Sequence, residues 1–103
     1  MTIKDLEEYL IISRANIRYY EKEGLLSPNR KDNKYRDYNT EDLAKLQKII
    51  VLRKLGISIT DIKKIFDGSK ELQEVIPEQI KILHEQIKEL NGALDVCIQI
   101  END

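Results

Sequence analysis

Side chains that can hold a phosphate group gather in residues 13–38. Ser13 precedes a helix that we expect over residues 14–23, and its hydroxyl can accept a hydrogen bond from an unpaired amide in the first turn. Ile17 and Tyr20 lie on the apolar face of this helix. Cationic and phenolic side chains lie off that face, namely Arg14, Arg18, Tyr19 and Lys22. The pattern indicates a surface turned to water or to a polyanion.

A second basic segment follows directly. Pro28 and the run NRKDNKYR favour two short strands around a turn at residues 32–34, because asparagine tolerates the left-handed conformation that tight turns need. The run carries four cations, Arg30, Lys31, Lys34 and Arg36. Such a hairpin suits a phosphate backbone, although it also suits a solvated surface. A basic helix face followed at once by a basic hairpin favours nucleic acid over the solvated alternative.

Two runs of the sequence carry a family pattern, ISRANIRYYEKEGLLSPNR and KYRDYNTEDLAKLQKIIVLRKLGISITDIKKI. They contain an Ile-Arg-Tyr-Tyr-Glu core, a Gly-Leu-Leu exit, a Tyr-Arg-x-Tyr motif and a Leu-Arg-x-Leu-Gly-x-Ser corner. From about Thr2 to Phe66 the chain therefore resembles the N-terminal DNA-binding domain of MerR-type bacterial transcription regulators. Three positions depart from that pattern. Ile11 and Lys34 stand where glycines are usual, and Ala15 stands where a basic or polar residue is common.

The resemblance implies a winged helix-turn-helix, with the basic helix as recognition helix and the hairpin as wing. Phosphate contacts are then expected from Arg18, Tyr19 and Arg36, while Arg14 and Asn16 are the better candidates for base edges. The full set of expected DNA-binding residues is Ser13, Arg14, Asn16, Arg18, Tyr19, Lys22, Arg30, Lys31, Lys34, Tyr35, Arg36 and Ser58.

Four helices are expected to position these side chains. Capping patterns and apolar spacing predict them over residues 3–9, 14–23, 40–55 and 59–66. The turn at Ile11 and Ile12 joins the first two as a helix-turn-helix pair. At the start of the fourth, the junction from Gly56 to Ser58 offers free amides to a second phosphate, or it is an ordinary capped corner. The resemblance favours the phosphate contact.

The remaining residues predict an element of a different kind. Residues 67–69 interrupt the helical pattern, and Pro77 separates a short helical piece near residues 70–75 from a long helix over residues 77–100. Starting at Ile76, apolar residues alternate at intervals of four and three, which is a heptad seam. The seam continues through Ile80, Leu83, Ile87, Leu90, Leu94 and Cys97.

The seam requires a partner. A lone helix of about 24 residues, roughly 36 Å long, cannot bury such a stripe against a head whose core is already filled. It either pairs with a second helix or packs back on its own head. The resemblance implies an antiparallel coiled coil between two subunits, with the off-seam residues Ile82, Val96, Ile98 and Ile100 free to meet the partner's head or a further domain. We therefore expect a DNA-binding domain at residues 1–68 and a linker with a dimerisation helix at residues 69–103.

Charge is divided unevenly along the chain. Residues 1–66 carry 14 Lys and Arg against 10 Asp and Glu, while residues 67–103 carry 3 against 9. A basic head and an acidic tail suit a protein of which only the head meets phosphate. The chain is 41% hydrophobic and 35% charged, and no apolar run is long enough to span a membrane. We expect a soluble, cytoplasmic protein.

Catalysis and metal binding find no support in the sequence. His84 has no second histidine at helical spacing, and Cys97 fits the seam as a small apolar residue. The chain lacks a Ser-His-Asp set, a glycine-rich phosphate loop and a cluster of metal-ligand residues. We expect no enzyme activity, no cofactor and no metal.

These features predict a mostly α-helical winged helix-turn-helix protein that regulates transcription by binding specific DNA. The resemblance implies a homodimer on a roughly palindromic promoter operator, which it distorts so that RNA polymerase can engage the promoter. Two alternatives stay open. One is an architectural or recombination-accessory DNA-binding protein without effector control, and the other is an interaction adaptor that acts through its coiled coil.

Overall fold

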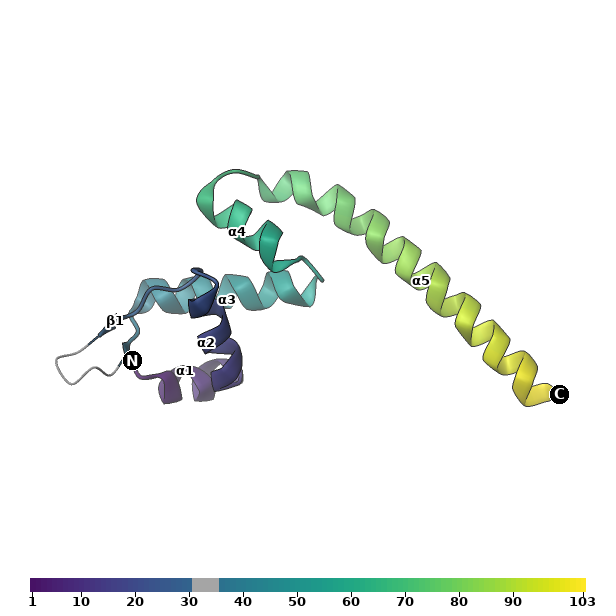
Figure 1. Cartoon of the computed structure of the whole chain (residues 1–103), viewed down its shortest axis with the longest axis horizontal. Helices are drawn as coiled ribbons and strands as arrows, with labels where there is room; N and C mark the ends of the chain where they lie inside the picture. The colour runs from purple at the N-terminus through teal and green to yellow at the C-terminus, as the bar shows by residue number, and fades with distance from the viewer. Residues whose placement is uncertain (31–35) are drawn as a thin grey trace.

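The computed structural model describes residues 1–30 and 36–103. In chain order its elements are α1 (Ile3–Leu10), α2 (Arg14–Lys22), β1 (Asn29–Arg30), β2 (Arg36–Asp37), α3 (Thr40–Lys54), α4 (Ile59–Asp67) and α5 (Leu72–Asn102). The first four helices gather into a head, and α5 leaves this head as one long helix (Figure 1). The predicted mostly helical fold is confirmed.

Local capping sets where the helices of the head begin. At α1, the Thr2 hydroxyl accepts from the Asp5 amide while the Asp5 carboxylate accepts from the Thr2 amide. That amide hydrogen bond lowers the pKa of the Asp5 carboxyl below its ordinary value. Asn39 and Asp42 make the same reciprocal pair at the start of α3. The predicted starts of both helices are confirmed, because a capping box depends only on residues three apart.

One apolar core joins the elements of the head. Its fully buried members come from every helix of the head and from the segments between them: Leu6, Ile17, Leu46, Ile49, Ile57 and Ile62. Tyr20 and Tyr38 are buried in the same core. Tyr20 therefore packs α2 against the core, as its position on the apolar face of the helix predicted.

Of the predicted wing, the structure describes only the base. β1 and β2 pair antiparallel, with Asn29 opposite Asp37 and Arg30 opposite Arg36. A complete hairpin is not seen, because residues 31–35 lie outside the described residues. The Met1 amino group fastens this base by donating to the Tyr38 carbonyl at 2.8 Å, and the Tyr38 amide donates back to the Met1 carbonyl at 2.8 Å.

The predicted break at Pro77 is wrong. α5 runs without interruption from Leu72 to Asn102 with Pro77 inside it. Pro77 is the sixth residue of α5, past the first turn, where a proline removes one backbone hydrogen bond and crowds the preceding turn at a cost of about 3 kcal/mol. On either side of it, Val75 and Gln79 are buried against the head. Burial of the first two turns offsets the cost, since a fully buried aliphatic side chain contributes roughly 1.5–3 kcal/mol.

Gln79 fixes the start of α5 to the end of α3. Its side-chain amide donates to the Leu55 carbonyl at 2.8 Å, so one of the unpaired carbonyls at the α3 terminus is satisfied. Gly56 lies directly beneath it. A Cβ at Gly56 would come within 2.7 Å of Gln79 Nε2 and would displace this amide, and the φ of +84° at Gly56 favours glycine over any residue with a Cβ.

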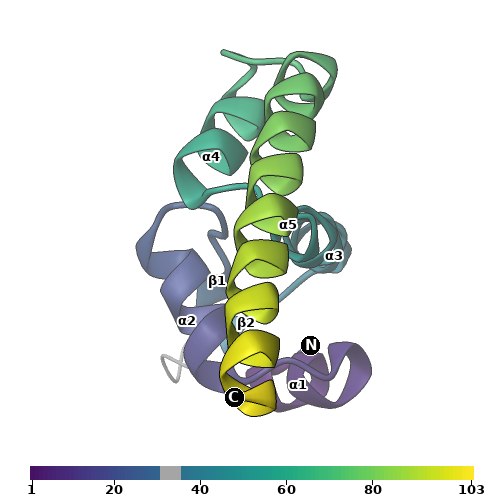
Figure 2. The same ribbon diagram turned by 90° about the vertical axis from the view of Figure 1, so that its right-hand side faces the viewer.

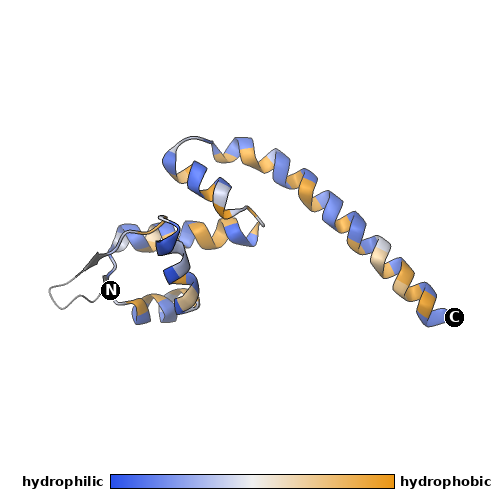
Figure 3. Cartoon of the chain, viewed as in Figure 1, coloured by the Kyte–Doolittle hydropathy of each residue, from blue (hydrophilic) through white to orange (hydrophobic). Residues whose placement is uncertain are grey.

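Beyond Gln79, α5 runs away from the head as an exposed helix. Every residue from Ile80 to Asp103 is exposed, and Figure 1 shows the helix projecting away from the head. Figure 2 looks from the side of the C-terminus, so that α5 lies in front of the head. Apolar residues recur along its projecting part (Figure 3). The helix does not pack back on its own head, which was the alternative to a partner. No helix in the described ranges is long and apolar enough to cross a membrane.

Candidate nucleic-acid interface

The helix α2 begins and ends as its sequence predicts, within one residue. The Ser13 hydroxyl accepts from the Asn16 amide at 3.2 Å and caps the first turn. At the other end Gly24 takes a φ of +80°, and the Leu25 amide donates to the Tyr20 carbonyl at 3.0 Å. This glycine closure turns the chain sharply back toward the core.

Three side-chain contacts lock α2 to its neighbours. Arg14 is paired with Glu7 of α1, where Arg14 Nε lies 2.8 Å from Glu7 Oε1. In the last turn of the helix, the Tyr38 hydroxyl donates to the carboxylate of Glu21. The last contact joins Glu23, just after the helix, to Lys63 of α4 at 2.6 Å. α2 is therefore tied to α1, to the segment that follows β2 and to α4.

The opposite face of α2 is left open. Arg18 and Lys22 are exposed, and neither forms an ion pair with any residue that the structure describes. Tyr19 is 45% exposed and its ring lies 5.7 Å from that of Tyr20. Two unpaired cations and a phenol, presented by a rigid helix, can contact a row of phosphates or the edge of a groove.

The two expected base-reading residues do not share a surface. Residues 14 and 16 of one helix point about 200° apart at roughly 100° per residue. Asn16 lines a hollow between the α1–α2 turn and α3, together with Ile50 and Arg53. Arg14, by contrast, lies on the flank of α2 that faces Glu7. The structure thus groups Arg14 with the cations of α2 and sets Asn16 apart.

The two serines of the expected site are both helix caps. Ser58 accepts from the Asp61 amide at 3.1 Å and opens α4, as Ser13 opens α2. Each hydroxyl satisfies one amide of its helix start, and the other amides of the first turn remain free for an anion. Both the capped corner and a phosphate contact at Ser58 are consistent with this geometry.

The wing residues are described only in part. Arg30 and Arg36 are paired opposite each other in the backbone register of the two strands. The predictions for Lys31, Lys34 and Tyr35 fall on residues outside the described part of the chain. Tyr38, after β2, is not a surface residue of the wing but is 2% exposed and belongs to the core of the head.

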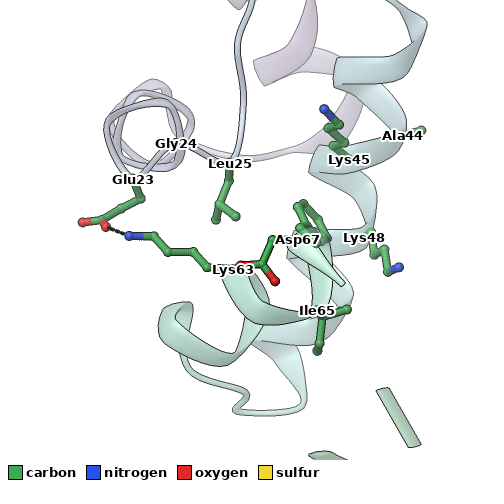
Figure 4. Close-up of a pocket in the computed structure, with 10 residues that line it drawn as sticks. Glu23, Gly24, Leu25, Ala44, Lys45, Lys48, Lys63, Ile65 and Asp67 are labelled. Atoms are coloured by element: carbon green, nitrogen blue, oxygen red, sulfur yellow. Dashed lines mark hydrogen bonds and ion pairs between the residues drawn. The ribbon is translucent and has the colours of Figure 1, made fainter. Parts of the chain in front are cut away.

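A groove of about 640 Å³ lies between the end of α2, α3 and α4 (Figure 4). Three lysines line it, and each is already engaged. Lys63 is paired with Glu23, Lys45 lies 3.4 Å from Glu41, and Lys48 stands 5.6 Å from the centre of the Phe66 ring. At its rim, hydrogen bonds from Ser69 lower the pKa of the Asp67 carboxyl. These contacts join the helices of the head and leave little unsatisfied charge for a ligand.

Sequence reasoning missed the acidic residues that hold the recognition helix. The partner of Glu7 is 7 positions away in the sequence and that of Glu23 is 40 positions away. No local spacing therefore marks either glutamate. Glu21 was visible as the last residue of the Ile-Arg-Tyr-Tyr-Glu core, but its contact with Tyr38 spans 17 positions. Among the described residues no group of three or more potential metal ligands is found.

Comparison with known proteins gives this arrangement a family. The family described as "MerR HTH family regulatory protein" matches residues 1–69, which span α1 to α4. The chain belongs to this MerR family. The "HTH-type transcriptional regulator ZntR homolog" of Haemophilus influenzae is 34% identical to this MerR-family chain over 91 residues, covering 87% of the chain and 67% of the relative.

Two solved structures extend the similarity to the tail. HiNmlR, "a MerR family regulator lacking the sensor domain, bound to promoter DNA", is 30% identical with a TM-score of 0.69, covering 92% of this chain and 78% of that one. MtaN, the N-terminus of the Bacillus subtilis multidrug transporter activator, has a TM-score of 0.83 at 23% identity, covering 96% and 95%. The second likeness concerns the fold of this MerR-family chain alone.

Proposed function

We propose that this protein is a MerR-type transcription regulator that binds a promoter operator through α2, the wing and the start of α4. The observation that carries the proposal is the open face of α2. Arg18 and Lys22 have no ionic partner among the described residues, and α2 is locked in place by Glu7, Glu21 and Glu23. Because the helix that carries these cations is fixed in place, their spacing along its face can match a row of phosphates.

The structure of HiNmlR, a MerR family regulator bound to promoter DNA, supports the proposal. In the same mode, the first turns of α2 would enter the major groove while the wing follows the adjacent backbone. The other DNA-binding residues expected from the sequence are assigned to this surface on the same basis, apart from Asn16, which lines the separate hollow against α3. Because the partner is bacterial DNA, we place the protein in the cytoplasm.

We further propose that the protein acts as a homodimer through an antiparallel coiled coil of α5. The seam residues are exposed in the protomer, with Leu90 at 70% and Ile87 at 54%. Water contact along such a stripe is unfavourable by roughly 25 cal/mol per Å² of apolar area. A two-fold axis through α5 would set two heads on a roughly palindromic site. Bending of the intervening promoter DNA by the two heads would change how RNA polymerase engages it.

Salt dependence of DNA binding tests the interface directly. Arg18→Ala removes one proposed phosphate contact, so the slope of log K against log salt should fall by about one unit per subunit and binding should weaken alike on all sequences. Lys88→Ala, a cation on α5 outside the seam, is the control and should leave the slope unchanged. Equal slopes for the wild type and Arg18→Ala would exclude α2 as the phosphate-binding helix.

Transcription in vitro separates a regulator from an architectural protein. On a promoter that carries the selected operator, a regulator changes the amount of transcript made by purified polymerase, and the Arg18→Ala variant should lose that effect. An architectural protein would bind and bend the same DNA without changing the transcript. An adaptor acting through α5 alone would keep its activity when Arg18 is replaced.

A further inference from the structure

The guanidinium of Arg14 is held along one edge by Glu7. Arg14 Nε donates to Glu7 Oε1 at 2.8 Å, and Arg14 Nη2 lies 2.8 Å from the same oxygen. A guanidinium carries five N–H donors in one rigid plane, so the edge turned away from Glu7 keeps its donors free. The side chains of Arg14 and Glu7 are 46% and 30% exposed, which leaves the pair open to solvent at the start of α2.

Stability alone does not account for this pair. An ion pair that is exposed to this extent is screened by water and salt and contributes little to folding. Glu7 also places a negative charge beside a surface that meets phosphate, and this charge opposes DNA binding. A surface built only for affinity would be stronger without the Glu7 carboxylate.

We propose that Glu7 is a positioning residue for base recognition, which fixes the Arg14 guanidinium so that its free edge hydrogen-bonds a guanine in the major groove. The inference rests on the function proposed above, in which α2 enters that groove. Arg14 is the first residue of α2, and the first residues of a recognition helix are those that reach base edges. Two N–H groups of an arginine match the O6 and N7 acceptors of guanine.

Glu7 acts on Arg14 in two ways. It immobilises a side chain that has much rotamer freedom, so less ordering remains to be done when DNA binds. It also cancels most of the charge of Arg14, which makes the guanidinium a poor phosphate ligand. Because Arg14 then gains little by binding a backbone phosphate, it adds little affinity for DNA that lacks the guanine. The site therefore discriminates against wrong sequences.

The test is the base preference of the full chain, measured by selection from a random duplex library. Arg14→Ala should flatten the preference at one base pair of each half-site by roughly tenfold to a hundredfold, the range of a bidentate contact. Glu7→Gln keeps the shape of the side chain and removes its charge. It should flatten the preference at the same base pair by about threefold to tenfold, with total binding unchanged or tighter.

Glu8→Gln is the matched control. Glu8 is the next residue of α1, it is exposed, and it makes no ion pair with any residue in the described ranges. Its replacement removes the same charge and should leave every base preference unchanged. Glu7→Gln added to Arg14→Ala should alter the preference no further, because the residue that Glu7 positions is already gone. Thermal melts of all variants show that each is folded.

The outcomes separate this inference from the proposed function. A full base preference in Glu7→Gln overturns the positioning role and leaves DNA binding intact. If Arg14→Ala keeps every preference while it still binds the selected site, Arg14 is not a base reader and Glu7 has nothing to position. If the wild type enriches no sequence at all, the proposed function fails together with the inference.

Discussion

Ile11 is the one residue of the described chain, apart from glycines, with a positive φ. It follows α1 at φ 53° and ψ 51°, and its side chain is 93% exposed. A β-branched residue in this left-handed conformation costs roughly 1–2 kcal/mol, and exposure gives it no burial in return. The sequence pattern already marked this position as one where glycine is usual. The turn after α1 is therefore left-handed at Ile11 although the residue there is not a glycine.

Replacement of Ile11 should therefore stabilise the protein. Ile11→Asn is expected to raise the free energy of unfolding by about 1 kcal/mol, because asparagine tolerates the left-handed region and no buried contact is lost. Ile11→Gly should gain less, since glycine also increases the entropy of the unfolded chain. Thermal melting measures both, and about 1 kcal/mol corresponds to roughly 4–8 °C in a chain of this size. A lower melting temperature for Ile11→Asn would mean that the isoleucine makes a contact in the assembled protein.

Residues whose roles depend on near neighbours were predictable, and those whose roles depend on distant ones were not. Thr2, Ser13 and Asn39 were assigned as caps because the bonded amide is three positions away. Glu7 was not assigned a role, since nothing in an exposed glutamate shows that it will meet Arg14 across a turn. The bounds of α2 could thus be predicted from sequence, but the contacts that hold the helix in place could not.

At the scale of elements, α5 shows the limit of a local rule. The rule that proline interrupts a helix predicted two helices on either side of Pro77, where the structure has one, Leu72–Asn102. The rule fails because the first turns of α5 are held by the head through Val75 and Gln79, which sequence alone does not reveal. The four helices of the head agree with prediction to within a residue at either end, because each has its own cap and apolar face.

The seam of α5 makes a sharp prediction about assembly. Leu90→Asp would bury an unpaired carboxylate at the centre of the proposed dimer, at a cost of several kcal/mol that a coiled coil of this length cannot absorb. Sedimentation should show a monomer, with the melting transition of the head retained. Asn91→Asp adds the same charge one residue further, off the seam, and should remain a dimer. A wild-type chain that is monomeric at micromolar concentration would refute the dimer.

For the whole molecule, two heads joined by a rigid coiled coil should tolerate only one separation of half-sites. An insertion of about five base pairs, half a helical turn, moves the second half-site to the far side of the duplex. Binding should then weaken by at least tenfold, since the second head no longer adds to the first. The monomeric Leu90→Asp variant should bind both DNAs equally. A wild-type dimer indifferent to the insertion would show that its heads are flexibly joined.

The contact between Gln79 and the Leu55 carbonyl fixes the first turns of α5 to the head, while the rest of the helix projects from that point like a lever arm. From Gln79 to the end of the helix is roughly 35 Å at 1.5 Å per residue. A rotation of about 10° at Gln79 therefore moves the far end by roughly 6 Å, close to the rise of two base pairs at 3.4 Å each. The burial of Val75, the side-chain amide of Gln79 and the close approach of Gly56 to that amide together hold this angle. In the proposed dimer, the tolerance for operator length would accordingly be an angular tolerance, set about two helix turns into α5.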